Sequence, residues 1–95
     1  MASNQIMAGL KISEMVAVIT RDNKFFMAEV ALAGYMSAGG SDYPVGPMLT
    51  HVKKSYKQKK NLVGYLDKCA REFKLKKYKL VMQTREENKA EIREV

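Results

Sequence analysis

Apolar and polar residues follow one another with several different spacings along this 95-residue chain, and each spacing predicts an element. In residues 3–20 the apolar side chains recur at loosely helical spacing after Ser3, which can cap a helix. The β-branched residues of VAVIT, at positions 16–20, favour a strand instead. We therefore expect an amino-terminal helix, and a hairpin over residues 15–33 that turns at residues 21–24 remains the alternative.

The next segment, KFFMAEVALAGYMSAGG at residues 24–40, is apolar nearly all round and rich in alanine. Asp22 or Asn23 can cap its start, and the pair Gly39-Gly40 can supply a left-handed stop. This pattern predicts a helix that is buried on several sides, either in the core or against another copy of the chain. The following residues 41–47, SDYPVGP, have the composition of a loop.

Two further helices are predicted in the second half of the chain. In residues 48–57, MLTHVKKSYK, the apolar residues recur at i, i+4 and i+8, and lysines occupy the opposite side. Residues 61–75, NLVGYLDKCAREFKL, show the clearest helical pattern, with Asn61 as a candidate cap. The spacing of Asp67 and Arg71 predicts a local ion pair on that helix.

The carboxyl-terminal residues 78–95 alternate between polar and apolar side chains, with a polar break near residues 86–88. This alternation predicts a β-hairpin, and a final helix over residues 85–95 is the alternative. The expected fold is a predominantly helical α+β domain of helices followed by a carboxyl-terminal hairpin. A helix pair followed by a hairpin is compatible with a winged helix-turn-helix.

The length of the chain predicts one domain that spans residues 1–95, since separate domains rarely have fewer than about 50 residues. Within it we expect an apolar half at residues 1–40, a loop at 41–47, a basic helical segment at 48–80, and a hairpin or tail at 78–95.

The formal net charge is +7, and the excess of positive charge lies in the middle third of the chain. Residues 51–80 hold eleven lysines and arginines against Asp67 and Glu72, whereas residues 1–50 and 81–95 each carry one more acid than base. Clustered cations attract phosphates, anionic lipid or acidic protein surfaces. The simpler alternative is a helix surface that lysines keep hydrated.

Lysine predominates over arginine in this basic segment, which predicts contacts to phosphates rather than to base edges. Four aromatic residues are interleaved with the lysines, and aromatic rings can stack on unpaired bases. Tyr56 and Phe73 fall on the apolar stripes and are expected in the core, so Tyr65 and Tyr78 are the stacking candidates. The predicted nucleic-acid-binding residues are Lys53, Lys54, Lys57, Lys59, Lys60, Tyr65, Lys68, Arg71, Lys74, Lys76, Lys77, Tyr78 and Lys79.

No segment has the residues of a catalytic or metal site, so we expect a non-enzymatic protein without a cofactor. His51, the single histidine, lacks partners for general base catalysis or metal binding, and Cys69 is expected to be a small buried apolar residue. The glycines of residues 37–47 follow the carboxyl end of a predicted helix, whereas phosphate-binding loops precede an amino end.

The longest apolar run, residues 25–36, contains Glu29 and is shorter than the roughly 18 to 20 residues that span a bilayer. The chain begins without the pattern of a secretory signal, and its single cysteine cannot form an internal disulfide. These features predict an intracellular protein, cytoplasmic or nucleoid-associated, without a transmembrane segment.

The leading hypothesis is a small basic protein that binds the phosphate backbone of DNA or RNA, duplex or single-stranded, with little sequence specificity. The alternative is a protein-interaction or self-assembling structural subunit that associates through the apolar amino-terminal half, as a homodimer or with another protein. A third hypothesis places a basic amphipathic helix over residues 61–75 on anionic lipid.

Overall fold

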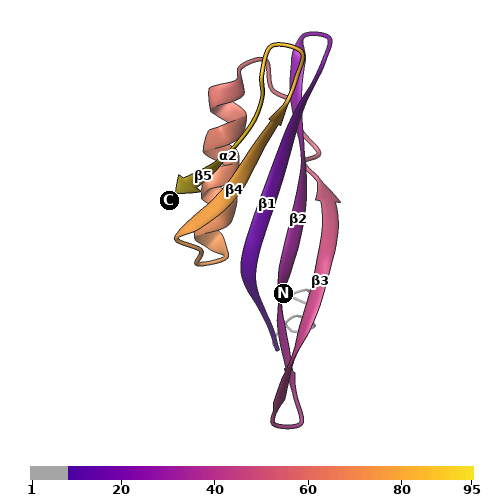
Figure 1. Cartoon of the computed structure of the whole chain (residues 1–95), viewed down its shortest axis with the longest axis vertical. Coiled ribbons are helices and arrows are strands. Elements are labelled where there is room, and N and C mark those ends of the chain that lie inside the picture. The colour runs from indigo at the N-terminus through magenta and orange to yellow at the C-terminus, as the bar shows by residue number, and fades with distance from the viewer. Residues whose placement is uncertain (1–8) are drawn as a thin grey trace.

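The computed structural model describes residues 9–95, which form a five-stranded β-sheet and one α-helix (Figure 1). The sheet order is β3-β2-β1-β4-β5; β1 and β4 are parallel, and the other neighbours are antiparallel. Along the chain the elements are β1 (Leu10–Asp22), β2 (Phe25–Ala38), β3 (Ser41–His51), α2 (Lys59–Glu72), β4 (Lys77–Gln83) and β5 (Asn88–Glu94).

Two tight turns connect the first three strands. Asp22 pairs with Phe25, so β1 and β2 are joined by two residues, of which Asn23 has a φ of 59°. Ala38 pairs with Ser41 across Gly39-Gly40, whose φ values are 59° and 82°. Two consecutive residues with positive φ suit the twist of a two-residue hairpin, and glycine adopts that conformation without steric cost.

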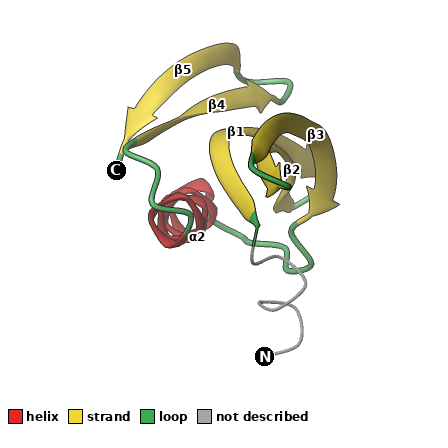
Figure 2. Cartoon of the chain, turned by 90° about the horizontal axis from the view of Figure 1, so that it is seen from below, coloured by secondary structure: helices red, strands yellow, loops and turns green. Residues whose placement is uncertain are grey.

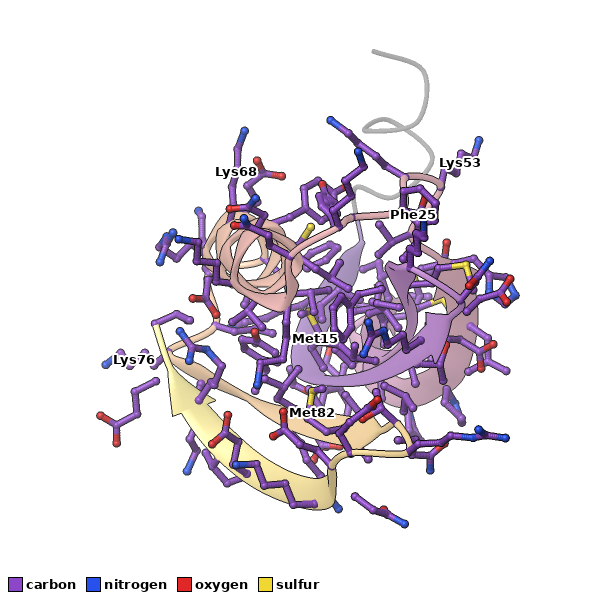
Figure 3. The ribbon with its side chains drawn as sticks, turned by 90° about the horizontal axis from the view of Figure 1, so that it is seen from above. Met15, Phe25, Lys53, Lys68, Lys76 and Met82 are labelled. Carbon is purple, nitrogen blue, oxygen red and sulfur yellow. The ribbon has the colours of Figure 1, made fainter. Side chains whose placement is uncertain are left out.

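The core lies between α2 and one face of the sheet, and Figure 2 shows the helix on that side only. Every second residue of the central strands points toward α2, which is the period of an extended chain. Met15 and Met82, both buried, lie in this interior (Figure 3). The buried apolar residues are Met15, Ala17, Ile19, Ala28, Val30, Leu62, Val63, Leu66, Ala70, Tyr78, Leu80 and Met82.

The predominantly helical fold expected from the sequence is wrong, because most of the described chain is strand. Residues 24–40, predicted as a helix, form β2, and Gly39-Gly40 is a hairpin turn rather than a helix stop. The segment looked apolar all round because both faces of β2 carry apolar residues: Ala28 and Val30 face α2, while Ala31 lies on the other face. Alanine fits a strand here because it is packed between neighbouring strands.

The helix predicted over residues 48–57 is also wrong. Residues 48–51 belong to β3, and an irregular segment follows in which Tyr56 pairs with Phe26. A spacing of i, i+4 and i+8 satisfies a period of two as well as a helical period, so Met48, Val52 and Tyr56 share one face in either conformation. The predicted loop at 41–47 is part of β3, whose prolines stand on an edge strand, where an amide donor is dispensable.

The amino-terminal helix is wrong where the structure describes it, and the alternative hairpin is confirmed as β1 and β2. Ser3, the suggested cap, lies outside the described residues. The helix predicted over residues 61–75 is confirmed as α2, and the carboxyl-terminal hairpin as β4 and β5. A winged helix-turn-helix is excluded as a description of residues 9–95, because the segment before α2 is a strand and not a helix.

Two glycine substitutions should test this architecture, because they are expected to change the free energy of unfolding in opposite directions. A methyl group at Gly34 would collide with the backbone of Lys11 on β1, whereas one at Gly64, on the exposed side of α2, meets nothing. We expect Gly34→Ala to lower the free energy of unfolding by about 1–3 kcal/mol, and Gly64→Ala to raise it by about 0.5–1 kcal/mol. Urea unfolding followed by circular dichroism measures both; a neutral Gly34→Ala would contradict the close approach of β1 and β2.

Candidate functional site

A groove of about 380 Å³ lies between α2 and the strands β2 and β3. It opens where the helix leaves this side of the sheet uncovered. We call it the aromatic groove, because three aromatic side chains stand among its walls. Its lining residues are Met15, Val30, Leu32, Thr50, His51, Val52, Lys53, Lys54, Tyr56, Tyr65, Cys69 and Phe73.

The rings of Tyr56 and Tyr65 face each other across one end of the groove. Their centroids are 6.3 Å apart and their planes are inclined by 36°, within the range of favourable aromatic contacts. Tyr56 is fixed through its backbone, which exchanges two hydrogen bonds with Phe26: the Phe26 amide donates at 2.6 Å and the Tyr56 amide at 3.0 Å. Tyr65 remains 43% exposed, so part of its ring is available to a ligand.

The helical side of the groove is made by Tyr65, Cys69 and Phe73, which recur every four residues along α2 and its carboxyl-terminal cap. A hydrogen bond with Cys69 raises the pKa of the Tyr65 hydroxyl, which therefore stays protonated and neutral at physiological pH. Phe73 is 39% exposed at the far end. The stripe offers flat apolar surface with a neutral hydroxyl at its rim.

Lysines stand around this aromatic surface. Lys53 and Lys54 line the groove from the segment between β3 and α2, and the Lys54 ammonium lies 5.5 Å from the centroid of the Tyr56 ring. Such a contact combines cation–π attraction with a charge still open to solvent. Lys53 and the helical Lys68 project from the same side of the molecule in Figure 3. A ligand in the groove would therefore meet positive charge from Lys53 and Lys54.

The structure disperses the other predicted binding residues. Lys59 is paired with Glu87 at 2.9 Å, and this hydrogen bond lowers the pKa of the Glu87 carboxyl. Lys77 and Lys79 alternate with buried residues of β4 and lie on the sheet face away from α2. Lys76 projects from a different side of the molecule than Lys53 (Figure 3). The exposed residues Lys57, Lys60, Arg71 and Lys74 belong to the helix and its two connecting segments.

Tyr78 is not available for stacking, because it is only 3% exposed and its hydroxyl donates a hydrogen bond of 2.8 Å to Asp67. Arg93 of β5 binds the same carboxylate through two nitrogens, at 2.8 and 2.6 Å. Asp67 is thus held by Arg93 rather than by Arg71, the partner predicted from the helical spacing. This cluster ties α2 to β4 and β5.

The pKa values of the cluster follow from its contacts. Burial opposes ionisation of Asp67, but the hydrogen bonds from Arg93 and Tyr78 outweigh it and lower the pKa of the carboxyl. Burial, and then the hydrogen bond to Asp67, raise the pKa of Tyr78. Asp67 is therefore held as a carboxylate and Tyr78 as a neutral hydroxyl, which indicates a structural role for both residues and for Arg93.

The sequence predicted Tyr65 as a binding residue and placed Tyr56 and Phe73 in the core. Tyr56 does pack against the core while it also lines the groove, whereas Phe73 is 39% exposed. The available signal was the width of the apolar stripe on α2: Leu62 and Leu66 fill the core, whereas residues 65, 69 and 73 form a second line beside it. One helix cannot bury both lines against the same sheet.

His51 and Cys69 are both among the residues that line the aromatic groove. The His51 imidazole is 3.5 Å from the Glu29 carboxylate; the His51 side chain is 78% exposed and that of Glu29 is 46% exposed. Within residues 9–95, no three histidine, cysteine or acidic side chains gather to hold a metal ion. The same part of the chain contains no helix long and apolar enough to cross a membrane.

Comparisons with protein-family models, with curated proteins and with solved structures gave no match.

The Asp67 cluster predicts acid sensitivity. Because the pKa of Asp67 is lowered in the folded state, its contribution to stability is present above the unfolded carboxyl value of about 3.9 and is lost as the pH falls through the folded value. We expect Asp67→Asn to reduce the free energy of unfolding at pH 7 by about 2 kcal/mol. It should also flatten the dependence of stability on pH below about 5. Urea titrations from pH 7 to 2 measure both.

Glu94→Gln is the matched control, since Glu94 is exposed on β5 and has no ion-pair partner within residues 9–95. It should leave stability and its pH dependence close to those of the parent protein. Equal pH profiles for Asp67→Asn and the parent would contradict the role of the Asp67 carboxylate.

Proposed function

We propose that this protein binds single-stranded nucleic acid, without catalysis and with little sequence specificity. Phosphates of the strand contact the lysines around the aromatic groove, and an unpaired base stacks on Tyr65. The observation that carries the proposal is that the exposed Tyr65, held against the half-buried Tyr56, meets Lys53 and Lys54 at one groove. Neither feature alone is unusual on a protein surface.

The site has two components, lysine ammonium groups and an aromatic ring, and they match the phosphate and the base of a nucleotide. A lysine ammonium neutralises a phosphate and releases counterions, which gives affinity without selecting a sequence. An aromatic ring accepts any base on its face, and this stacking is worth about 1–3 kcal/mol per base. The tilted arrangement of Tyr56 and Tyr65 supports the second component, because Tyr56 holds Tyr65 from one side and leaves 43% of it exposed.

The shape of the site favours a single strand over a duplex. Bases of a duplex are stacked inside the helix and cannot reach a ring recessed in a groove, whereas a single strand can turn a base outward. The groove volume of about 380 Å³ is within the usual range for small-molecule sites.

The proposal includes an intracellular location, cytoplasmic or nucleoid-associated, where nucleic acid is accessible. The single cysteine supports it, since no internal disulfide ties the fold to an oxidising compartment. Cys69 lies in the groove wall and can remain a thiol there.

Neutralising the lysines beside the groove should weaken binding and change its salt dependence. For the triple variant Lys53→Gln, Lys54→Gln and Lys57→Gln we expect at least a tenfold loss of affinity for a single-stranded oligonucleotide at low salt. The slope of log affinity against log salt should fall by about 2, because about 0.7 counterions are released per contact with a single strand. Fluorescence anisotropy at several salt concentrations measures both quantities.

The matched control removes the same charge elsewhere: Lys74→Gln, Lys76→Gln and Lys77→Gln. This variant should keep most of the affinity and most of the slope. Equal losses in the two variants would show a diffuse effect of net charge and would overturn the assignment to the groove, and an absence of binding by the parent protein at low salt would overturn the function.

Replacing the stacking ring tests the second component. Tyr65→Ala should weaken binding to single strands by about 1–3 kcal/mol while it leaves the salt slope unchanged. Tyr65→Phe, which keeps the ring and loses only the hydroxyl, should bind as the parent does. Equal affinities of Tyr65→Ala and the parent protein for single strands would refute stacking at this position.

A further inference from the structure

The face of the sheet opposite α2 carries an ordered block of side chains on its three central strands. On β1, Val16 and Val18 point to this face, between the core residues of the same strand. Glu29 and Val81 flank Val18 on the two sides, and Ala31 and Lys79 flank Val16. We call these six residues the open-face block.

The block continues into exposed apolar residues on both outer strands. Leu49 of β3 pairs with Ala31 and is 66% exposed, and Ile92 of β5 pairs with Lys79 and is 61% exposed. A sheet face that is exposed to solvent usually carries polar residues. Here an apolar band crosses the sheet, interrupted by Glu29 on β2 and Lys79 on β4, and no described element covers it.

The charges within the block are arranged for self-pairing. Apolar residues Val81 and Ala31 occupy one diagonal of the block, and Glu29 and Lys79, of opposite charge, occupy the other. In a face-to-face pair of identical sheets, a two-fold axis between the sheets exchanges two diagonal corners. Glu29 of each copy then meets the partner's Lys79, while Val16 and Val18 lie at the centre.

We infer that the open-face block is the interface of a homodimer, in which two copies pack sheet to sheet. An isologous interface must be complementary to itself, and the diagonal of opposite charges meets that requirement. The occupant is a second copy because the two charges of the block match each other, so the partner that they specify is the same block.

Two further features support the face rather than an edge as the contact. The chain has a net charge of +7, so two copies repel over most of their surfaces, whereas the two charges of the block cancel. The edge strand β3 contains Pro44 and Pro47, and β5 alternates charged residues, both of which discourage pairing between edges. The aromatic groove lies on the helix side, so the dimer leaves both grooves open.

Charge reversal tests the inference through its symmetry. The parent protein should sediment toward twice its monomer mass of 10.8 kDa as its concentration rises. Glu29→Lys and Lys79→Glu, each made alone, place like charges opposite one another and should weaken the dimer at least tenfold. The double variant Glu29→Lys with Lys79→Glu restores opposite pairs and should recover most of the affinity.

The controls separate this pairing from net charge and from misfolding. Glu91→Lys changes the net charge as Glu29→Lys does but lies on the other face, so it should leave the dimer intact; circular dichroism shows that each variant folds. A strictly monomeric parent protein overturns the inference and leaves the face to a different partner. A dimer that neither single reversal weakens also overturns it, because the copies then meet elsewhere.

The result is distinguishable from the proposed binding of nucleic acid through Lys79→Glu, because Lys79 does not line the aromatic groove, whereas Glu29 lies 3.5 Å from the groove residue His51. Affinity of the monomeric Lys79→Glu variant for single strands therefore reports on the proposed function separately.

Discussion

A single helix of 14 residues packs against a sheet of five strands and is too small to cover it. Most features of the molecule follow from this incomplete cover. A sheet has two faces, and α2 covers only one of them. The core is therefore confined to the helix side of β1, β2 and β4. Where α2 does not reach across β2 and β3, the aromatic groove remains, and the opposite face keeps its apolar band uncovered.

Asp67 and the apolar contacts together set the position of the helix. Apolar packing holds α2 against the sheet, and the bidentate bond from Arg93 and the hydroxyl of Tyr78 fix one further point of its surface. With that point held toward β4 and β5, the stripe that begins at Tyr65 is turned toward β2 and β3. The geometry of the groove thus depends on a carboxylate outside it.

The sequence predicted well those elements whose pattern fits only one period. Leu62, Leu66 and Ala70 recur every four residues and charged residues follow at 67, 68, 71 and 72, a pattern that specifies a helix. The alternation around Tyr78 and Leu80 specifies a strand. Residues 24–40 and 48–57 were mispredicted because their patterns fit both periods. What makes them strands is the pairing of β2 with β1 and β3, which the spacing of apolar side chains does not encode. The lysines were visible, but Tyr56 as a groove residue depends on its bridge to Phe26, which sequence spacing does not encode.

The parallel pairing of β1 with β4 joins a strand near the start of the chain to one near its end. On a ribosome, β1, β2 and β3 emerge first and can pair through their short turns before α2 has been made. Until α2 and β4 follow, Met15 and Ile19 face water on one side of the nascent sheet while the apolar band faces it on the other. The partly synthesised protein is then a sheet with apolar surface exposed on both faces. It is most prone to aggregation in the interval before α2 has been synthesised and has packed.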